Sequence, residues 1–183
     1  MILYKYLRPE RIDVLDTGMI MLSRPRAFND PFELSPDVAS IDSGIKMVGA
    51  TWAHTKDRVV LSLAENRDSL LMWGHYTDGH KGILIGFDAD DEILAEPSKD
   101  RRLARVVYAK TRPSRPNIED FTEEELYFTK SDEWAYEREW RILDSFEAAS
   151  GSRPGGAPDT WPFRLNPQGG EGSDLRLQGR PSA

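Results

Sequence analysis

The sequence predicts an α+β domain with a mixed, mostly antiparallel central sheet and several short helices. Two observations predict this fold class. The N-terminal segment has the order strand, short helix, glycine, strand. Further along the chain, the apolar runs at residues 59–63 and 82–87 are typical of buried strands.

The N-terminal elements follow from alternation and from residues that begin and end helices. Residues 3–6 alternate as a strand does, with successive side chains on opposite faces. A short helix then begins near Pro9 and ends at Gly18, because proline is tolerated in a first turn and glycine favours a helix end. Residues 19–23 form the second expected strand.

Later elements are expected between the two apolar strands and after them. Asp68 or Ser69 can cap a helix that ends near Gly79. A strand is expected at 103–108, a helix at 119–130 and the last strand at 138–143. Four large side chains on these elements should be mostly buried, namely Trp73, Phe87, Val107 and Trp140.

Length and composition predict one domain followed by a tail. We expect residues 1–148 to form the domain, and residues 149–183 to be a poorly ordered tail, because half of the 14 glycines lie after residue 150. The chain has no cysteine, which excludes disulfides and thiolate zinc sites and suits a reducing compartment. No signal peptide or long apolar run is present, so we expect a cytoplasmic protein without a membrane segment.

Charge is unevenly distributed along the chain. The net charge of −7 argues against general electrostatic binding of nucleic acid. Residues 99–115 are nevertheless rich in lysine and arginine, and an acidic segment follows at 119–125. Two interpretations stay open: a solvated basic strand edge beside an acidic helix, or a local patch that binds phosphates.

A first cluster of candidate site residues is the segment Phe28–Glu33, which reads FNDPFE. The Asn-Asp-Pro run favours a rigid turn, because proline fixes its own φ and restricts the residue before it. Such a turn could present Asn29 and Glu33 to a ligand. Alternatively, its polar groups satisfy the backbone of the loop itself.

The second cluster is Met72–Gly82, with His75 and Tyr76 as candidates for a hydrogen-bonding role in a pocket. Its two histidines lie five residues apart and do not share a helix face, so we predict no metal site. A purely structural histidine is the alternative.

The third cluster, Lys130–Arg141, carries the densest charge. On a strand, Glu137, Glu139 and Arg141 would share one face. Two carboxylates beside an arginine can be a catalytic acid pair with its orienting charge, or a ladder of cross-strand salt bridges. We expect all three clusters to converge on one cleft.

Six ordered motifs resemble a widespread bacterial domain family of unknown function, found alone or in predicted phage-defence contexts. They are a Lys-Tyr start, FNDPFE, LSL at residues 61–63, MWGHY followed by a Gly-Ile-Leu-Ile-Gly-Phe strand, VVY at 106–108, and EWAYEREWR at 133–141. The resemblance covers residues 3–143. Family members continue with more strand sequence where this chain has its glycine-rich tail.

The chain is more distantly similar to ADP-ribosyltransferase-like proteins, which use NAD. That resemblance implies that NAD is the co-substrate of a toxin or phage-defence effector that transfers ADP-ribose or hydrolyses NAD. It further implies three sets of site residues: Lys5 or Tyr6 holding NAD, Ser62 or Tyr76 on the nicotinamide side, and Glu137 or Glu139 facing the developing positive charge. The first strand lacks the usual His or Arg, and no Ser-Thr-Ser motif is present.

A nonenzymatic module that senses a nucleotide or RNA is the competing prediction. It would use the basic stretch, with Arg101, Arg102, Arg105 and Arg112 on the phosphates and aromatic residues as stacking surfaces. Both predictions require a nucleotide or small-molecule ligand, and the first adds an RNA or protein acceptor. The sequence gives no indication of the oligomeric state.

Overall fold

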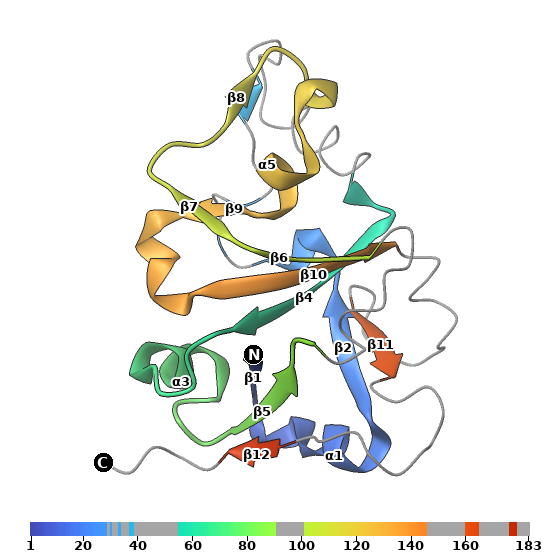
Figure 1. The fold of residues 1–183 in the computed structure, drawn as a ribbon, viewed down its shortest axis with the longest axis vertical. Coiled ribbons are helices and arrows are strands. Elements are labelled where there is room, and N and C mark those ends of the chain that lie inside the picture. Colours follow the sequence, from blue (N-terminus) through green and yellow to red (C-terminus); the bar gives the residue numbers. More distant parts are fainter. Residues whose placement is uncertain are drawn as a thin grey trace.

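An eight-stranded sheet forms the framework of the molecule (Figure 1). The computed structural model describes residues 1–28, 30, 33, 37–38, 55–90, 101–145, 160–164 and 176–178. The sheet consists of β1 (Ile2–Leu7), β2 (Met19–Ser23), β4 (Arg58–Ala64), β5 (Ile83–Asp88), β6 (Arg102–Arg105), β10 (Glu139–Ser145), β11 (Thr160–Arg164) and β12 (Arg176–Gln178). Its main path is β11-β2-β4-β1-β5-β12, and β10 pairs with both β4 and β6. All of these pairs are antiparallel, which confirms the predicted α+β class.

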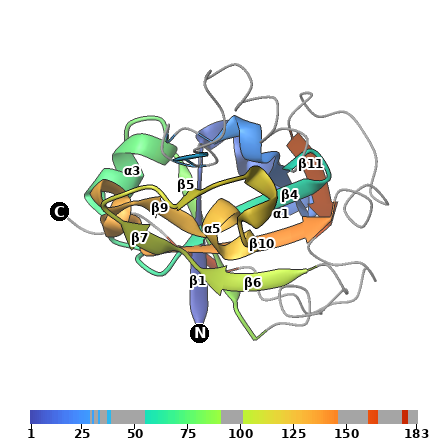
Figure 2. The ribbon, with the colours of Figure 1, turned by 90° about the horizontal axis from the view of Figure 1, so that it is seen from above.

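Short helices and two small parallel ladders surround this sheet. Among the described residues, the α-helices are α1 (Asp13–Thr17), α3 (Leu70–Tyr76) and α5 (Glu123–Tyr127). The 3-10 turns in the same ranges are η1 (Pro9–Ile12), η2 (Pro25–Ala27), η3 (Ile118–Asp120) and η4 (Asp132–Glu137). The ladders pair β3 (Asp37–Val38) with β8 (Ser114–Arg115), and β7 (Val107–Ala109) with β9 (Thr129–Ser131). Figures 1 and 2 show α5, β7 and β9 gathered at one end of the molecule, on the side of β10. In the described ranges, no helix has the length and apolar character that crossing a bilayer requires.

The ends of α3 follow from local chemistry. Of the two predicted caps, Ser69 is the N-cap, and its hydroxyl accepts a hydrogen bond from the N–H of Met72 at 3.3 Å. The helix ends at Tyr76, before the expected position of Gly79. Asp78, Gly79 and His80 follow with φ of 51°, 62° and 69°, and this left-handed turn leads the chain directly into β5.

Alternating residues of β4 face two different cores. Leu61 and Leu63 pack in one cluster with Phe87, whereas Val60 packs in another with Phe128. Trp73 and Phe87 are 2% and 6% exposed, so their predicted burial is confirmed. Both faces of the central strand β4 are therefore buried, which explains its continuous apolar run in the sequence.

The predicted burial of Val107 is wrong. The expected strand at 103–108 breaks after Arg105, and the N–H of Val106 donates to the carbonyl of Glu139 at 2.9 Å. Val106 is thereby buried, and Val107 is 62% exposed. Trp140, which was also expected to be mostly buried, is half-buried, and its indole N–H donates to Glu65 at 2.8 Å.

Two further expectations need correction. The helix expected at 119–130 is instead η3, α5 and the strand β9, because capping boxes at Asn117 and Thr122 each begin a separate short helix. The strand at 139–145 is not the last one, since β11 pairs with β2 and β12 pairs with β5. The other residues of the expected tail, 149–183, lie outside the described residues, and their poor order stays a prediction.

The strands β1 and β2 diverge beside β4 and leave a space between them. β10 pairs with β4 along its whole length. On the opposite edge of β4, Val60 pairs with Ser23 of β2 and Ala64 pairs with Tyr4 of β1. β1 and β2 diverge between these two points, as Figure 1 shows, so the sheet splits beside the middle of β4.

Candidate functional site

A cavity of about 360 Å³ lies at this split and brings the sequence clusters together. Of the ten residues predicted for a site, nine line it: Lys5, Tyr6, Glu33, Ser62, His75, Tyr76, Glu137, Glu139 and Arg141. The tenth, Asn29, lies outside the described residues. The cavity therefore receives side chains from β1, β4, α3, the loop before β3, and the segment from β9 to β10. The role of each residue stays a prediction.

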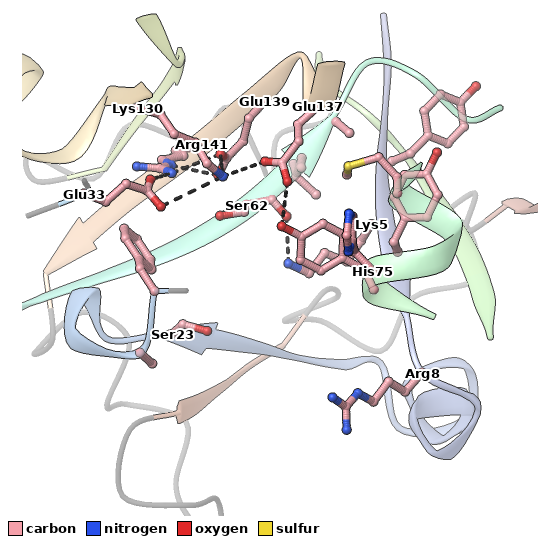
Figure 3. A pocket seen from close by; sticks show the side chains of 18 residues that line it. Lys5, Arg8, Ser23, Glu33, Ser62, His75, Lys130, Glu137, Glu139 and Arg141 are labelled. Carbon is pink, nitrogen blue, oxygen red and sulfur yellow. Dashed lines mark hydrogen bonds and ion pairs between the residues drawn. The ribbon is translucent and has the colours of Figure 1, made fainter. Parts of the chain in front are cut away.

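Five charged side chains form an ionic cluster on one wall of the cavity, namely Glu33, Lys130, Glu137, Glu139 and Arg141 (Figure 3). All five are buried, with exposed fractions of 6% or less. Three carboxylates and two cations carry one surplus negative charge. Because burial of unpaired charge is costly, the cluster must be held together by its internal contacts.

Arg141 is the centre of one half of the cluster. Its Nε and Nη2 contact the two carboxylate oxygens of Glu139 at 2.8 and 2.9 Å, which is a bidentate ion pair. Nη2 also pairs with Glu33, and Nη1 donates to the carbonyl of Tyr127 at 2.6 Å. The guanidinium lies 4.7 Å from the ring centre of Phe28. These contacts fix Arg141 and Glu139 as a rigid unit.

Lys130 joins the two halves of the cluster. Its Nζ lies 2.6 Å from Glu137 Oε2, 3.1 Å from Glu139 Oε2 and 3.9 Å from Glu33 Oε2. The same ammonium lies 4.9 Å from the ring centre of Trp134. The sequence clusters included this lysine, but it was not predicted as a site residue. Its place in the same sequence cluster as Glu137 and Glu139, two acidic candidates that need a counter-charge, was the signal that could have identified it.

Glu137 reaches the cavity from a turn, not from the strand on which it was expected. It ends the 3-10 turn η4, and Arg138 then adopts φ 45° before β10 begins at Glu139. Glu137 Oε1 accepts the hydroxyl of Tyr76 at 2.6 Å, while Oε2 accepts Lys130. Of the predicted acid pair, Glu139 is thus held by an arginine and Glu137 by a tyrosine and a lysine.

Burial and charge shift the pKa values of the cluster in different directions. Burial alone raises the pKa of a carboxyl, but Arg141 and Lys130 outweigh it and lower the pKa of Glu139 to about 2. For Glu33, burial outweighs the same two cations and raises the pKa above 4.5. Burial lowers the pKa of Lys130, but the three glutamates more than offset it, and the pKa rises above 10.5. Glu139 and Lys130 are therefore charged at neutral pH, whereas burial makes Glu33 easier to protonate.

Lys5 occupies the split between β1 and β2. Its Nζ donates to the backbone carbonyl of Ser62 on β4 at 2.8 Å, at the edge from which the neighbouring strands diverge. Burial is the main influence on this amine and lowers its pKa from 10.5 to about 8. Figure 3 shows Lys5 and Ser62 below the ionic cluster, and Arg8 and Ser23 farther from it. The cavity thus has an ionic end and a strand-split end, the latter formed by Lys5, Arg8, Ser23 and Ser62.

Tyr6 and His75 have aromatic neighbours as well as a place in the cavity wall. The Tyr6 hydroxyl donates to the carbonyl of Asn66 at 2.6 Å, and its ring packs edge-on to Trp73 at 5.5 Å. Burial raises the pKa of Tyr6 to about 12. His75 is exposed, and its ring lies within 6.2–6.4 Å of the rings of Tyr76, Trp134 and Tyr136. Tyr6 therefore contributes to the core, and His75 to an aromatic rim.

The basic stretch is largely occupied by ion pairs with carboxylates. Arg101 pairs with Asp144, Arg102 with Glu124, Arg105 with Glu65, and Arg115 with Glu125. This arrangement corresponds to the solvated basic edge beside an acidic helix. Among the described residues, no group of three or more His, Cys, Asp or Glu has the arrangement that could hold a metal ion.

Comparison with known proteins gives a family match without an activity. The chain matches no curated protein sequence and no solved structure. Residues 72–142 match a family described as "Protein of unknown function (DUF2971)", a stretch that runs from α3 into β10. This stretch contains Tyr76, Lys130, Glu137, Glu139 and Arg141, so most of the ionic cluster lies inside the match. The comparisons therefore support a domain family of unknown function for this part of the chain.

Proposed function

We propose that the cavity binds NAD and cleaves the bond between its nicotinamide and ribose, as a glycohydrolase or an ADP-ribosyltransferase-like effector. The observation that carries this proposal is the carboxylate of Glu137, which is buried in the cavity wall and oriented by Tyr76 and Lys130. A fixed carboxylate in a cavity can stabilise a positive charge that develops in a bound sugar.

The proposed reaction begins at C1 of the nicotinamide-bearing ribose. The C1–N bond breaks, and its electron pair goes to the nicotinamide nitrogen, which loses its positive charge. C1 becomes part of an oxocarbenium-like centre, and Glu137 stabilises it. Water, or a hydroxyl or carboxylate oxygen of an acceptor, then bonds to C1 from the opposite face, and a protonated nucleophile releases its proton to solvent.

The two predicted glutamates have different roles in this proposal. Glu139 has both carboxylate oxygens bound to Arg141 or Lys130, so it positions Lys130 and does not face the substrate. Both oxygens of Glu137 also have partners, but these are one tyrosine hydroxyl and one lysine, with no bidentate arginine among them. In this proposal Glu137 is therefore the carboxylate that faces the sugar. Lys130 is the link through which the locked pair orients the reacting carboxylate.

The size of the cavity fits part of the ligand. Its volume of about 360 Å³ is at the lower end of ligand sites, which span roughly 300–1,000 Å³. It suits the nicotinamide riboside half, with the diphosphate directed to the exposed guanidinium of Arg8 at the strand-split end. An RNA or protein acceptor would approach from solvent in the transferase version of the reaction.

Release of nicotinamide from NAD tests the proposal. The purified protein is incubated with NAD, alone and with bacterial lysate, and nicotinamide is quantified by chromatography. Glu137→Gln keeps the shape but removes the charge, and we expect at least about 100-fold slower release. Glu133→Gln is the matched control, because Glu133 lies on the same turn but is exposed. NAD labelled in its adenylate phosphate then shows whether lysate RNA or protein becomes modified.

The outcomes separate the two functional hypotheses. Equal release by wild type and Glu137→Gln would exclude Glu137 from the chemistry. If NAD binds in calorimetry but no nicotinamide is released under any condition, the protein is a nucleotide-sensing module and not an enzyme.

A further inference from the structure

Lys5 differs from the other cavity cations in its surroundings. It lies on β1 between the buried leucines Leu3 and Leu7, on the face that packs into the main core. Its one described hydrogen bond goes to the neutral carbonyl of Ser62, and among the described residues no carboxylate lies within ion-pair distance of its Nζ. Lys5 nevertheless lines the cavity and is only half-buried.

The groups that face Lys5 leave its amine unusually easy to deprotonate. Burial has the largest effect, Glu139 and Glu137 act against it from a distance, and the cations Arg11 and Lys130 reinforce it. The resulting pKa of about 8 means that about a tenth of the amine is neutral at pH 7, against less than about 0.1% for an ordinary lysine. A neutral amine is the nucleophilic form of lysine.

We propose that Lys5 is a nucleophile that forms an imine with the aldehyde carbon of a phosphorylated sugar bound in the cavity. The choice of sugar rests on the proposed function, because hydrolysis of NAD leaves a ribose whose C1 opens to an aldehyde and whose C5 carries a phosphate. The exposed guanidinium of Arg8, three residues from Lys5 at the strand-split end, supplies the opposite charge for that phosphate.

The step balances without a further reactant. The unprotonated Nζ of Lys5 bonds to C1 as the C=O π bond opens, and one proton passes from the nitrogen to the oxygen to give a carbinolamine. The nitrogen then loses its last proton as the C–O bond breaks, and this proton and the departing hydroxyl leave as one water while a C=N bond forms. No oxidant or reductant is consumed.

Reductive trapping with ribose 5-phosphate tests the inference on the intact chain. Cyanoborohydride converts any imine into a stable secondary amine, and peptide mass spectrometry then locates it. We expect Lys5 to be modified at least about 10-fold faster than Lys81, which is exposed and paired with Asp78, and Lys110, which is exposed. The rate at Lys5 should rise with pH and level off above about 8.

Two variants and one control sugar sharpen the result. Lys5→Arg keeps the charge but removes the nucleophile, so modification of the N-terminal peptide at that position should disappear while Lys81 reacts as before. Arg8→Gln should slow trapping of ribose 5-phosphate at Lys5 but not trapping of ribose, which lacks the phosphate. Modification of Lys5 at the same rate as Lys81 would overturn the inference.

The result is separable from the proposed function, because ribose 5-phosphate is supplied directly and no NAD is cleaved in the assay. Selective trapping without nicotinamide release would support the nucleophile and reject the NAD reaction. Nicotinamide release with unselective trapping would support the NAD reaction and reject Lys5 as a nucleophile.

Discussion

The two ends of the cavity have opposite effects on charge: the ionic end stabilises it, and the strand-split end disfavours it. At the ionic end, Arg141 and Lys130 contact three carboxylates, and the pKa of Glu139 falls to about 2 in spite of its burial. At the strand-split end, Lys5 contacts a neutral carbonyl, and burial lowers its pKa to about 8. The comparison shows that partners, more than depth, decide whether a buried side chain remains charged.

Removal of Arg141 should give the largest effect, because it breaks the ionic end. Arg141→Met leaves the buried carboxylates of Glu33 and Glu139 without their main counter-charge. We expect the free energy of unfolding in urea at pH 7 to fall by about 3–5 kcal/mol.

Arg102→Met is the control for that measurement. Arg102 pairs with Glu124 on the surface, where solvent screens the interaction, so its loss should cost no more than about 1 kcal/mol. Similar losses in the free energy of unfolding for the two variants would show that burial does not increase the contribution of the ion pairs at the ionic end.

Acid should expose the contribution of Glu139. Its pKa is lower in the folded protein than the ordinary 4.5, so its contribution to stability is complete above about pH 4.5 and is lost as the pH falls toward 2. From the size of this shift we expect about 3 kcal/mol. Stability of the wild type should therefore fall more steeply between pH 5 and pH 2 than that of Glu139→Gln, measured by urea unfolding at each pH. Parallel curves would contradict the low pKa of Glu139.

Alkali should give a smaller effect of opposite sign at Lys5. Below pH 8 the amine is protonated in both folded and unfolded chains, and the folded state bears the cost of a charge with little solvation. Between pH 8 and 10.5 the folded protein has lost that proton while the unfolded chain keeps it, so stability gains from this group as pH rises. The wild type should gain about 1–2 kcal/mol relative to Lys5→Met between pH 8 and pH 10, less than the full shift allows because the cavity admits water. A wild type that loses stability relative to the variant over this range would refute the lowered pKa.

Sequence patterns predicted the elements of the fold well where residues close together in the chain determine them. The β-branched run around Val60 and the cap Ser69 both lie where local chemistry placed them. The burial of Val107 was mispredicted because the chain changes its pairing partner at this point: Val106 still bonds to Glu139 beside β10, whereas Val107 pairs with β9 and is exposed. Such long-range contacts leave no local pattern.

The candidate site shows the same limit. The sequence placed Glu137 and Glu139 on one strand face, whereas the left-handed Arg138 separates a turn from a strand, and each glutamate has different partners. Lys130 was expected at the end of a helix, whereas it lies in the short strand β9. The residue types in the sequence identified the side chains that meet in the cavity. Which of them form ion pairs or hydrogen bonds with each other depends on the three-dimensional arrangement, which the sequence pattern does not give.

The ionic cluster also has a consequence for the order in which the chain folds. Lys130 is only seven residues from Glu137 and nine from Glu139, so these contacts close short loops with a small loss of chain entropy. The contact between Arg141 and Glu33 spans 108 residues, and that between Lys5 and Ser62 spans 57. Lys130, Glu137 and Glu139 can therefore meet early, within one local segment, whereas the cavity exists only after the N-terminal strand has docked. The set of side chains that would bind a ligand is thus completed by long-range contacts, which form more slowly than local ones.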